Sequence, residues 1–296
     1  MQSPERLLRH AEIKVARRLD GVLQGERRGR RPGPGDEPAV TRAYEPGDDV
    51  RWVDWPLSAR TGEPMVRVPE IEPVLTAWIL LDRSASMAFG SAVRTKAEVG
   101  QEIVAGIGAV LRRRGDRLGV VATRNGELDL VRPPRGDRRA LIEALAATER
   151  VEPRISSGET NLSKAITALG RIARHRGLVA IISDFPAERR IEEAIGVLSR
   201  RHEVLAIEVR DRREHELPEI GPIRLQDMET GRQRLIDTAD PRFRQRFRQE
   251  VERAANGRQS MLRRAGARHI VVQPDTDWLT PVVYGLRRPT PRRRVG

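Results

Sequence analysis

The chain has 296 residues and a formal net charge of +13 at pH 7, and it contains no cysteine. The lack of cysteine excludes disulfides, thiolate zinc sites and a cysteine nucleophile. No stretch approaches the roughly 18 unbroken apolar residues of a membrane-spanning helix, and the first residues lack the apolar core of a signal peptide. We therefore expect a cytoplasmic protein without a membrane span.

The positive charge favours a nucleic-acid partner only in part. Lysine occurs only at Lys14, Lys96 and Lys164, so nearly all the positive charge is arginine, which a compositional bias explains as readily as a binding surface. Aromatic residues make up 3% of the chain, too few for the stacking platforms that hold single-stranded nucleic acid. A basic nucleic-acid-binding protein therefore stays an alternative and not the leading interpretation.

Residues 1–74 are predicted to form an N-terminal extension. Apolar residues at helical spacing predict an amphipathic helix over 6–23, and residues 25–38 are dense in Gly, Pro and Arg, which is typical of a mobile loop. A strand is expected around 65–68. It should lie at a sheet edge or end at Pro69, because proline cannot donate to a ladder.

A charged block with half of the chain's tryptophans lies between that loop and that strand. Its charged and aromatic members are Asp48, Asp49, Arg51, Trp52, Asp54 and Trp55. The charged residues could form a functional site. We favour a structural role, in which a buried ion-pair and aromatic mini-core ties this region to the main domain.

From residue 75 onward, predicted strands and helices alternate. Apolar runs at 77–81 and 178–182 predict strands buried on both faces, the type found in parallel sheets. Further strands are expected at 118–123, 128–131 and 204–209, and the first two should form a hairpin that turns at Asn125-Gly126. Helices are expected at 95–114, 137–147, 162–172 and 191–198, and Gly177 should close the third of them. Such alternation is typical of βαβ units. Residues 75–286 are therefore predicted to form a doubly wound, mostly parallel α/β domain.

Residues 211–238 interrupt the alternation of strands and helices. They predict a hairpin insertion that turns at Thr230-Gly231. A helix is expected from Phe243 onward, with an interruption near Gly257. A last strand over 267–273 and a short helix over 278–286 follow. Residues 287–296 form a basic tail.

The first buried strand ends in candidate metal ligands. Asp82 is followed by hydroxyls at Ser84 and Ser86. Open α/β sheets place their ligands at the carboxyl ends of strands, and one carboxylate with two neutral oxygens suits a hard cation such as Mg²⁺. The alternative is that Ser84 or Ser86 only caps the next helix.

Thr160 and Asp184 offer further oxygens at the same edge of the predicted sheet, although each could be only a helix cap. With Asp82, Ser84 and Ser86, they resemble the metal-ion-dependent adhesion site of the von Willebrand factor A-like fold. The resemblance implies that Ser84, Ser86 and Thr160 contact Mg²⁺ or Mn²⁺ through their hydroxyls. Asp82 and Asp184 would then act largely through water.

The charged block near the N-terminus resembles a more specific family. The run Tyr44-x-Pro46-Gly47-Asp48-Asp49-x-Arg51-x-x-Asp54-Trp55, with Ser58-Ala59-Arg60-Thr61-Gly62, resembles the signature of the domain of unknown function 58 family. Two later runs are similar to further motifs of that family, Asp211-x-x-Glu214-x-x-Leu217-Pro218-x-x-Gly221 and Asp227-x-Glu229-x-Gly231. The resemblance covers roughly residues 40–240.

This resemblance implies a non-enzymatic protein-binding or adaptor protein with a Mg²⁺-dependent docking site. It also implies a MoxR-type AAA+ ATPase as the partner, in remodelling or maturation of other proteins. An Asp or Glu of that ATPase or of its client would complete the coordination of the metal. The chain lacks the G-x-x-x-x-G-K-[ST] loop that cradles nucleotide phosphates, so ATP hydrolysis is not expected.

The enzymatic alternative is a metal-dependent hydrolase. Metal-assisted hydrolysis needs a second metal or a general base beside the ion. None of the chain's five histidines lies in the three segments that offer the metal ligands. The sequence therefore favours binding over catalysis.

Overall fold

The computed structural model describes residues 3–26, 39–69, 74–90, 94–149, 161–186, 188, 190–214, 216–226 and 233–287. Residue contacts divide the chain into two compact units, one of residues 1–18 with 75–296 and one of residues 19–74. Residues 1–18 thus belong with the larger unit and not with the N-terminal extension assigned from the sequence. The reason is the apolar face of α1 (Pro4–Glu26), which buries Leu8 and Val15. Glu12 on the same helix pairs with Arg112 at 2.9 Å.

The larger unit is built on a six-stranded sheet in the order β10-β7-β6-β3-β4-β5. Its strands are β3 (Thr76–Asp82), β4 (Arg117–Arg124), β5 (Glu127–Arg135), β6 (Leu178–Ser183), β7 (Glu203–Val209) and β10 (Arg268–Val272). All neighbours pair in parallel except β4 and β5, which form the predicted hairpin. Asn125 and Gly126 turn it with φ of 50° and 82°, the left-handed region that this dipeptide tolerates. The prediction of a doubly wound, mostly parallel sheet is confirmed.

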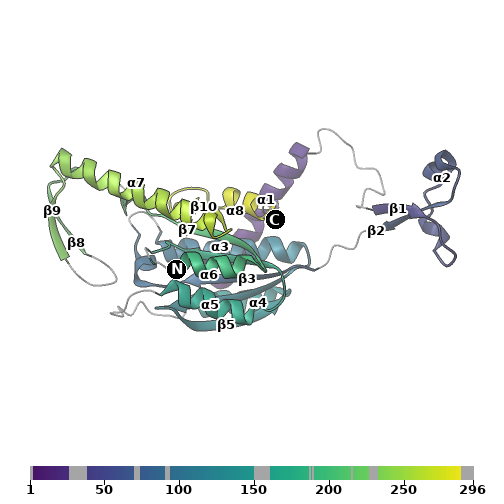
Figure 1. Ribbon diagram of the computed structural model, residues 1–296, viewed down its shortest axis with the longest axis horizontal. Coiled ribbons are helices and arrows are strands. Elements are labelled where there is room, and N and C mark those ends of the chain that lie inside the picture. Colours follow the sequence, from purple (N-terminus) through teal and green to yellow (C-terminus); the bar gives the residue numbers. More distant parts are fainter. Residues whose placement is uncertain are drawn as a thin grey trace. The chain divides into compact units, whose positions relative to one another are not determined.

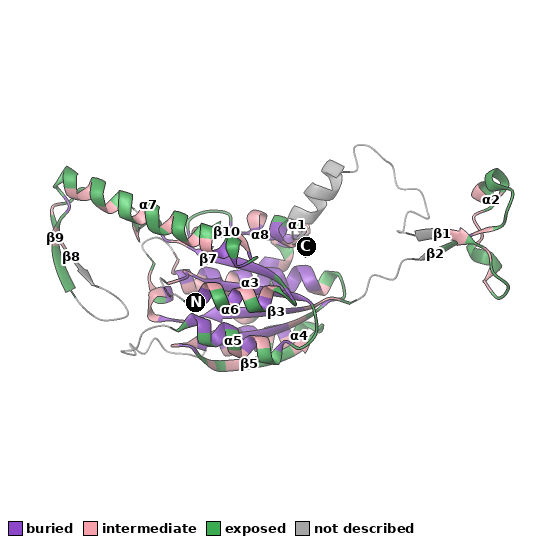
Figure 2. Ribbon diagram, in the orientation of Figure 1, coloured by how far each residue is buried: buried purple, intermediate pink, exposed green. Residues whose placement is uncertain are grey.

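Helices cover both faces of the sheet (Figure 1). One layer holds α5 (Leu162–Ile172), α6 (Ile191–Ser199) and the C-terminal part of α7 (Pro241–Arg264), whose apolar residues share one core cluster with β3 and β6. The other layer holds α3 (Lys96–Arg113), α4 (Arg138–Glu149) and α8 (Leu279–Arg287). Figure 2 shows the buried residues concentrated in the strands and in the faces of the helices that cover them. Deleting a large apolar side chain from such a core costs about 2–5 kcal/mol.

Parallel pairing brings the carboxyl ends of β3, β6 and β7 to one edge of the sheet, here called the rim. Every residue of β6 is buried, as are all but the first of β3 and of β7. Gly177 permits the approach of the chain to β3, since a Cβ there would lie 2.0 Å from the carbonyl oxygen of Thr76. Gly177 does not close the preceding helix as predicted, because α5 ends at Ile172.

The region after β7 contains a hairpin and one long helix. Strands β8 (Pro222–Gln226) and β9 (Gln233–Asp237) pair antiparallel as predicted, while the expected turn at residues 230–231 lies outside the described residues. The predicted interruption of the next helix is wrong: α7 runs through Gly257 without a break. Asp240 begins α7 by accepting a hydrogen bond from the backbone N–H of Arg242 at 2.8 Å. The predicted basic tail, apart from Arg287, also lies outside the described residues.

The smaller unit pairs β1 (Ala39–Ala43) with β2 (Met65–Pro69) in a two-stranded antiparallel sheet. Between them lie a short 3-10 helix (Val50–Trp52) and α2 (Trp55–Thr61). Pro69 is the last residue of β2, as expected for a residue that cannot donate to the ladder. Of the predicted 25–38 loop, residues 25 and 26 belong to α1 and the rest lies outside the described residues.

The predicted buried mini-core of this unit is wrong. Trp52 and Trp55 are 50% and 69% exposed. The ion pairs lie at the surface of the unit and join Arg42 to Asp48, Arg51 to Asp49 and Arg67 to Asp54. Each carboxylate also accepts a backbone N–H, so the charged residues order turns and helix starts instead of filling a core.

Among the described helices, none combines the length and the apolar character that crossing a membrane requires.

The N-cap of α2 gives a test of this local role. Asp54 accepts the backbone N–H of Leu57 at 3.1 Å and the guanidinium of Arg67 at 2.8 Å. We expect Asp54→Ala to speed amide hydrogen exchange across α2, because the first turn loses its side-chain acceptor. Asp54→Asn keeps that acceptor and should exchange almost as slowly as the wild type. Exchange measured by mass spectrometry that is equally slow in Asp54→Ala would contradict the capping role.

Candidate metal centre

The rim brings together four of the five residues predicted to surround a metal. Asp82 is the last residue of β3, and Asp184 follows directly on its neighbour β6. Ser84 and Ser86 lie in the turn after β3, where Ala85–Ala88 form a short 3-10 helix. Thr160, the fifth predicted ligand, lies outside the described residues.

Asp82 is buried and fixed by two hydrogen bonds. Asp82 is only 1% exposed to solvent. Its Oδ1 accepts the backbone N–H of Ser84 at 2.9 Å, and its Oδ2 accepts the hydroxyl of Ser183 at 2.6 Å. The Ser183 hydroxyl in turn accepts the backbone N–H of Phe185 at 2.9 Å. Asp82 therefore orders both the turn after its own strand and the turn after β6.

The two serine hydroxyls lie side by side, with 3.0 Å between the Oγ atoms of Ser84 and Ser86. The alternative role as helix caps does not hold for either serine. Ser84 makes no side-chain capping bond to the 3-10 helix that follows it, and α3 begins with its own capping box on Thr95 and Glu98. The paired hydroxyls are thus available as oxygen ligands.

Asp184 does not act as a helix cap either, because the N-cap residue of α6 is Arg190, which makes no side-chain capping bond. One of its carboxylate oxygens, Oδ2, accepts the ammonium of Lys96 at 2.8 Å. The other, Oδ1, is buried and has no hydrogen-bond partner among the described residues. A buried carboxylate oxygen without a partner is costly, and a cation is the kind of ligand that would satisfy it.

Lys96 is a member of the site that the sequence analysis missed. It is the first residue of α3, is 1% exposed, and places its ammonium 2.6 Å from Glu214 as well as 2.8 Å from Asp184. Glu214 ends the short 3-10 helix Arg212–Glu214, whose start Asp211 orders by accepting the backbone N–H of Arg213 at 2.8 Å. The motif around Asp211 and Glu214 thus delivers a carboxylate to the rim.

Burial and the negative charge of Asp184 raise the pKa of Asp82 to about 6, against the hydrogen bonds from Ser183 and Ser84. Burial acts to lower the pKa of Lys96, but the charges of Asp184 and Glu214 outweigh it and raise that pKa. The rim therefore holds a protonated lysine among three carboxylates and keeps an excess of negative charge. Such an environment attracts a further cation.

The donor set fits a hard cation such as Mg²⁺, which prefers oxygen ligands and keeps several waters. No cluster of three or more His, Asp or Glu side chains able to hold a metal occurs in the described ranges. A cation at the rim would therefore depend on the hydroxyls of Ser84 and Ser86, the residues that the sequence analysis proposed.

A cavity of about 300 Å³ opens beside this group, between the rim and α7. Ser86, Asp184 and Glu214 line it on the side of the predicted metal ligands, and Val251, Ala254 and Arg258 line it from α7. The cavity thus offers space for a group from another molecule next to the serine hydroxyls.

Glu208, at the carboxyl end of β7, anchors the far wall of that cavity. It is 1% exposed and is bonded by His269 at 2.8 Å, Arg210 at 2.8 Å and Arg258 at 3.1 Å. Burial acts to raise the pKa of Glu208, but His269, Arg258 and Arg210 lower it to about 2. This ionised carboxylate joins β7, β10 and α7. Its local sequence gives no sign of that role, since two of its three partners, Arg258 and His269, come from distant segments.

A family model described as a protein of unknown function, DUF58, matches residues 40–257. The chain belongs to the DUF58 family. This confirms the resemblance that the N-terminal block and the later motifs predicted.

Similar proteins include Rv1480, an uncharacterised protein of Mycobacterium tuberculosis (strain ATCC 25618 / H37Rv). It is 38% identical over 277 residues, which cover 93% of this chain and 86% of the relative. Among solved structures, the conserved hypothetical protein BatB of Bacteroides thetaiotaomicron is 15% identical with a TM-score of 0.46, covering 72% of this chain and 97% of BatB. The VWA domain of SpRpn10 is 12% identical with a TM-score of 0.40, covering 76% of this chain and all of that domain.

Lys96→Met tests the charge arrangement at the rim. Removing the ammonium leaves the partly buried carboxylates of Asp184 and Glu214 without their cation, and breaking a buried pair in this way costs up to about 3–5 kcal/mol. For a unit of this size we expect the melting temperature to fall by about 10 °C. The matched control is Lys164→Met, whose lysine pairs at the surface with Glu127 and should change the melting temperature little. Equal melting of the two variants in calorimetry would contradict this arrangement.

Proposed function

We propose that this DUF58 protein is a non-enzymatic adaptor that binds partner proteins through a Mg²⁺-dependent site at the rim. The observation that carries the proposal is the group formed by the buried carboxylate of Asp82, the partly buried carboxylate of Asp184 and two adjacent hydroxyls, in which Asp184 Oδ1 has no hydrogen-bond partner among the described residues. Ser84, Ser86 and Thr160 would hold the ion, with Asp82 and Asp184 in support. The structure describes four of these residues, and Thr160 remains a prediction from the sequence.

A bound Mg²⁺ or Mn²⁺ would supply a positive centre that can accept one further oxygen from outside the chain. The protein's own residues prepare the place for it. Asp82 holds the turn that carries Ser84, and Lys96 fixes one oxygen of Asp184 and leaves the other unbonded. The ligand that enters is proposed to be an Asp or Glu side chain of a partner, which reaches the serine hydroxyls through the adjoining cavity.

Adaptor function is favoured over hydrolysis by the state of the neighbouring acids and bases. A hydrolase would need a free general base beside the ion. Within the described part of the rim, Lys96 and Glu214 are paired with each other, and Glu208 is held by two arginines and a histidine. These pairings leave Lys96, Glu214 and Glu208 occupied with charge compensation, and the proposal assigns Asp82 and Asp184 to the support of the ion.

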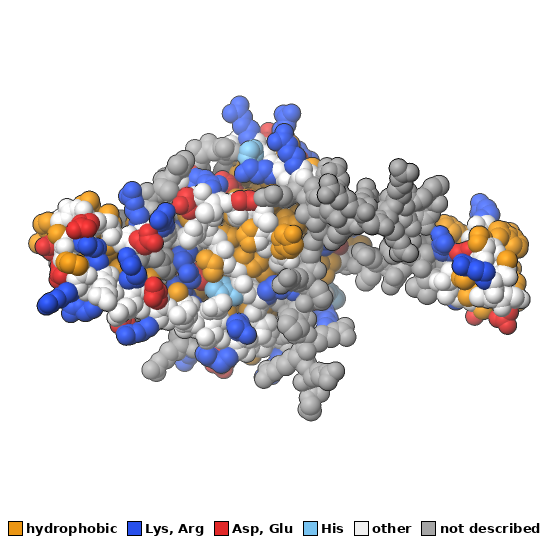
Figure 3. Space-filling view, turned by 90° about the horizontal axis from the view of Figure 1, so that it is seen from above, with side chains coloured by type: hydrophobic (Ala, Val, Ile, Leu, Met, Phe, Trp, Pro, Cys, Tyr) orange, Lys and Arg blue, Asp and Glu red, His pale blue; other side chains and the backbone are white. Residues whose placement is uncertain are grey.

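A nucleic-acid function has less support from the surface. On the face of the larger unit seen in Figure 3, basic and acidic side chains are interspersed over α7. Several arginines there pair with carboxylates, as Arg253 does with Glu250 and Arg264 with Glu192. Such pairing reduces the positive charge that this face of α7 could offer to phosphates.

The proposed partner is a MoxR-type AAA+ ATPase or the client of that ATPase. This part of the proposal rests on the family resemblance, together with the absence of a nucleotide-binding loop of the P-loop type from the sequence. The division of labour would place recognition on this chain and ATP hydrolysis on its partner.

Mn²⁺ binding followed by electron paramagnetic resonance tests the ion site. We expect one Mn²⁺ per chain. Asp82→Asn should weaken binding by about 10–100-fold, because the neutral side chain keeps its shape but loses the supporting charge. Asp275→Asn, which alters an exposed carboxylate beyond β10, is the matched control and should bind as the wild type does. Wild-type affinity in Asp82→Asn would refute the site.

Interferometry with a purified MoxR-type ATPase from the same organism tests docking. Chelator and Asp82→Asn should each weaken the complex, and their combination should add little, because both remove one interaction. Raising the salt concentration should weaken the complex less than chelation does. A complex that survives both chelator and Asp82→Asn but is lost at high salt would contradict metal-mediated docking.

A further inference from the structure

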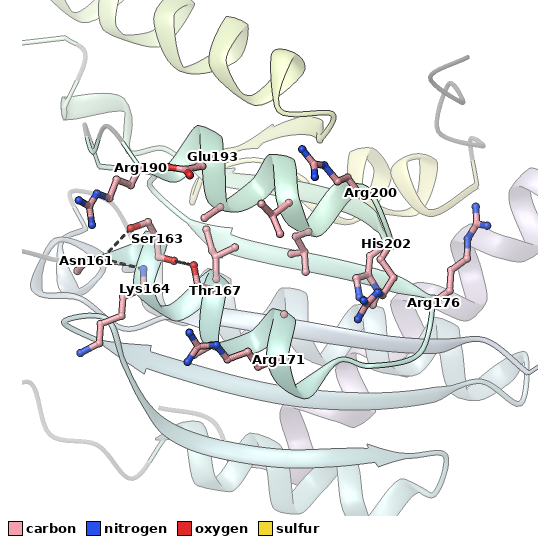
Figure 4. Close-up of a pocket in the computed structure, with 17 residues that line it drawn as sticks. Asn161, Ser163, Lys164, Thr167, Arg171, Arg176, Arg190, Glu193, Arg200 and His202 are labelled. Atoms are coloured by element: carbon pink, nitrogen blue, oxygen red, sulfur yellow. Dashed lines mark hydrogen bonds between the residues drawn. The ribbon is translucent and has the colours of Figure 1, made fainter. Parts of the chain in front are cut away.

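A second and larger cavity lies between α5 and α6, away from the predicted metal ligands. It has a volume of about 1270 Å³ and is lined by both helices and by the turns that follow them (Figure 4). We call it the α5–α6 groove. Asn161 and Arg190 lie near one end of it in Figure 4, and Arg176 and His202 lie near the other.

The edges of the groove are strongly basic. The charged residues that line it are Lys164, Arg171, Arg176, Arg190, Arg200, Arg201 and Glu193, so six basic side chains face a single acidic one. Lys164 pairs with Glu127. The five arginines are exposed, and none of them forms an ion pair with a described residue.

Neighbouring arginines of the same helix layer are paired, which makes the groove distinct. Arg264 of α7 binds Glu192 of α6 through two hydrogen bonds of 2.9 Å. Glu192 and Glu193 are adjacent in the sequence, so α6 directs one carboxylate toward α7 and one toward the groove. The exposed arginines that line the groove have no such carboxylate partner among the described residues.

The floor of the groove is apolar and is formed largely by small side chains. Ile166 and Leu198 are buried beneath it, and the small residues Ala168, Gly170 and Ala194 leave the two helix backbones accessible. Val197 is 60% exposed at its edge. The groove thus presents an apolar stripe between two rows of cationic side chains.

We propose that the α5–α6 groove binds an acidic amphipathic helix of a partner protein. A helix with a narrow apolar face, flanked by Asp and Glu, matches both the floor and the charged edges. The furrow between two packed helices also suits a third helix, whose side-chain ridges can enter it. The chain's own C-terminal tail cannot take this place, because residues 287–296 carry five arginines and would be repelled.

A nucleic acid fits the groove less well than an acidic helix does. Its described lining contains no Phe, Tyr or Trp, and His202 is buried, so bases would find little surface on which to stack. The apolar floor would instead meet a strand of phosphates and sugars. RNA binding is accordingly an outcome that the experiment below can detect.

The proposed experiment uses the full chain and three fluorescein-labelled peptides of about 18 residues, or five helical turns. The first carries Leu on one helical face and Glu on the other, the second has the same composition scrambled, and the third replaces Glu by Lys. Fluorescence anisotropy should show binding of the first peptide at least about tenfold tighter than of the second, and no binding of the third. Binding should be the same in Mg²⁺ and in chelator, because this site needs no ion.

Two sets of variants locate the binding. Arg171→Glu with Arg190→Glu should weaken the first peptide by about tenfold or more, because like charges then face each other. Val197→Lys should also weaken it by placing a charge at the edge of the apolar floor. The matched control, Arg246→Glu with Arg248→Glu on exposed positions of α7, changes net charge equally and should leave affinity unaltered.

Four outcomes would overturn the proposal. The first is that the scrambled peptide binds as tightly as the first peptide, and the second is that the α7 control variant loses as much affinity as the groove variant. The third is that chelator abolishes binding of the first peptide, and the fourth is that an oligouridine competes with this peptide and loses its binding in the same groove variants. The third outcome would assign the acidic peptide to the rim. The metal-dependent docking proposed above does not depend on the groove, so either site can fail alone.

Discussion

The structure depends on one constraint, the burial of carboxylates where parallel strands end. β3 and β6 are adjacent, and their apolar residues are buried by helices on both faces. Asp82 and Asp184 are therefore brought together at the rim with little access to water, and their mutual repulsion has to be offset. Hydrogen bonds from Ser183 and Ser84 offset part of it for Asp82, and Lys96 offsets part of it for Asp184. The remaining negative charge is the basis on which we propose that the rim binds a cation.

The same need for compensation organises the surrounding elements. Lys96 draws Glu214 and its 3-10 helix against α3. Glu208 draws Arg258 of α7 and His269 of β10 against β7. Each buried charge thus adds a polar contact that links a separate segment to the sheet or to α3. Breaking such pairs is costly because the charge that remains stays buried.

Much of the fold and part of the site could be predicted from the sequence. Buried strands leave continuous apolar runs, and parallel pairing places the residues after them at one edge, so the proximity of Asp82 and Asp184 followed from local patterns. The place of Lys96 in the site could not be predicted in this way. Its two carboxylate partners lie 88 and 118 residues away, and a lysine in a first helical turn ordinarily faces water. The burial expected for Trp52 and Trp55 was wrong for a related reason. A local motif shows which residues lie near one another in the sequence, but it does not show whether other parts of the chain cover their side chains and exclude solvent.

The central claim is that the rim holds a divalent cation on the hydroxyls of Ser84 and Ser86. Anomalous diffraction from crystals of the full chain soaked in Mn²⁺ tests it most directly, because it locates the ion without reference to activity or partner. The account predicts one strong anomalous peak in contact with both serine hydroxyls and close to the Asp184 oxygen that has no partner. A site filled elsewhere, such as beside Glu208, with no peak at the serines would contradict it.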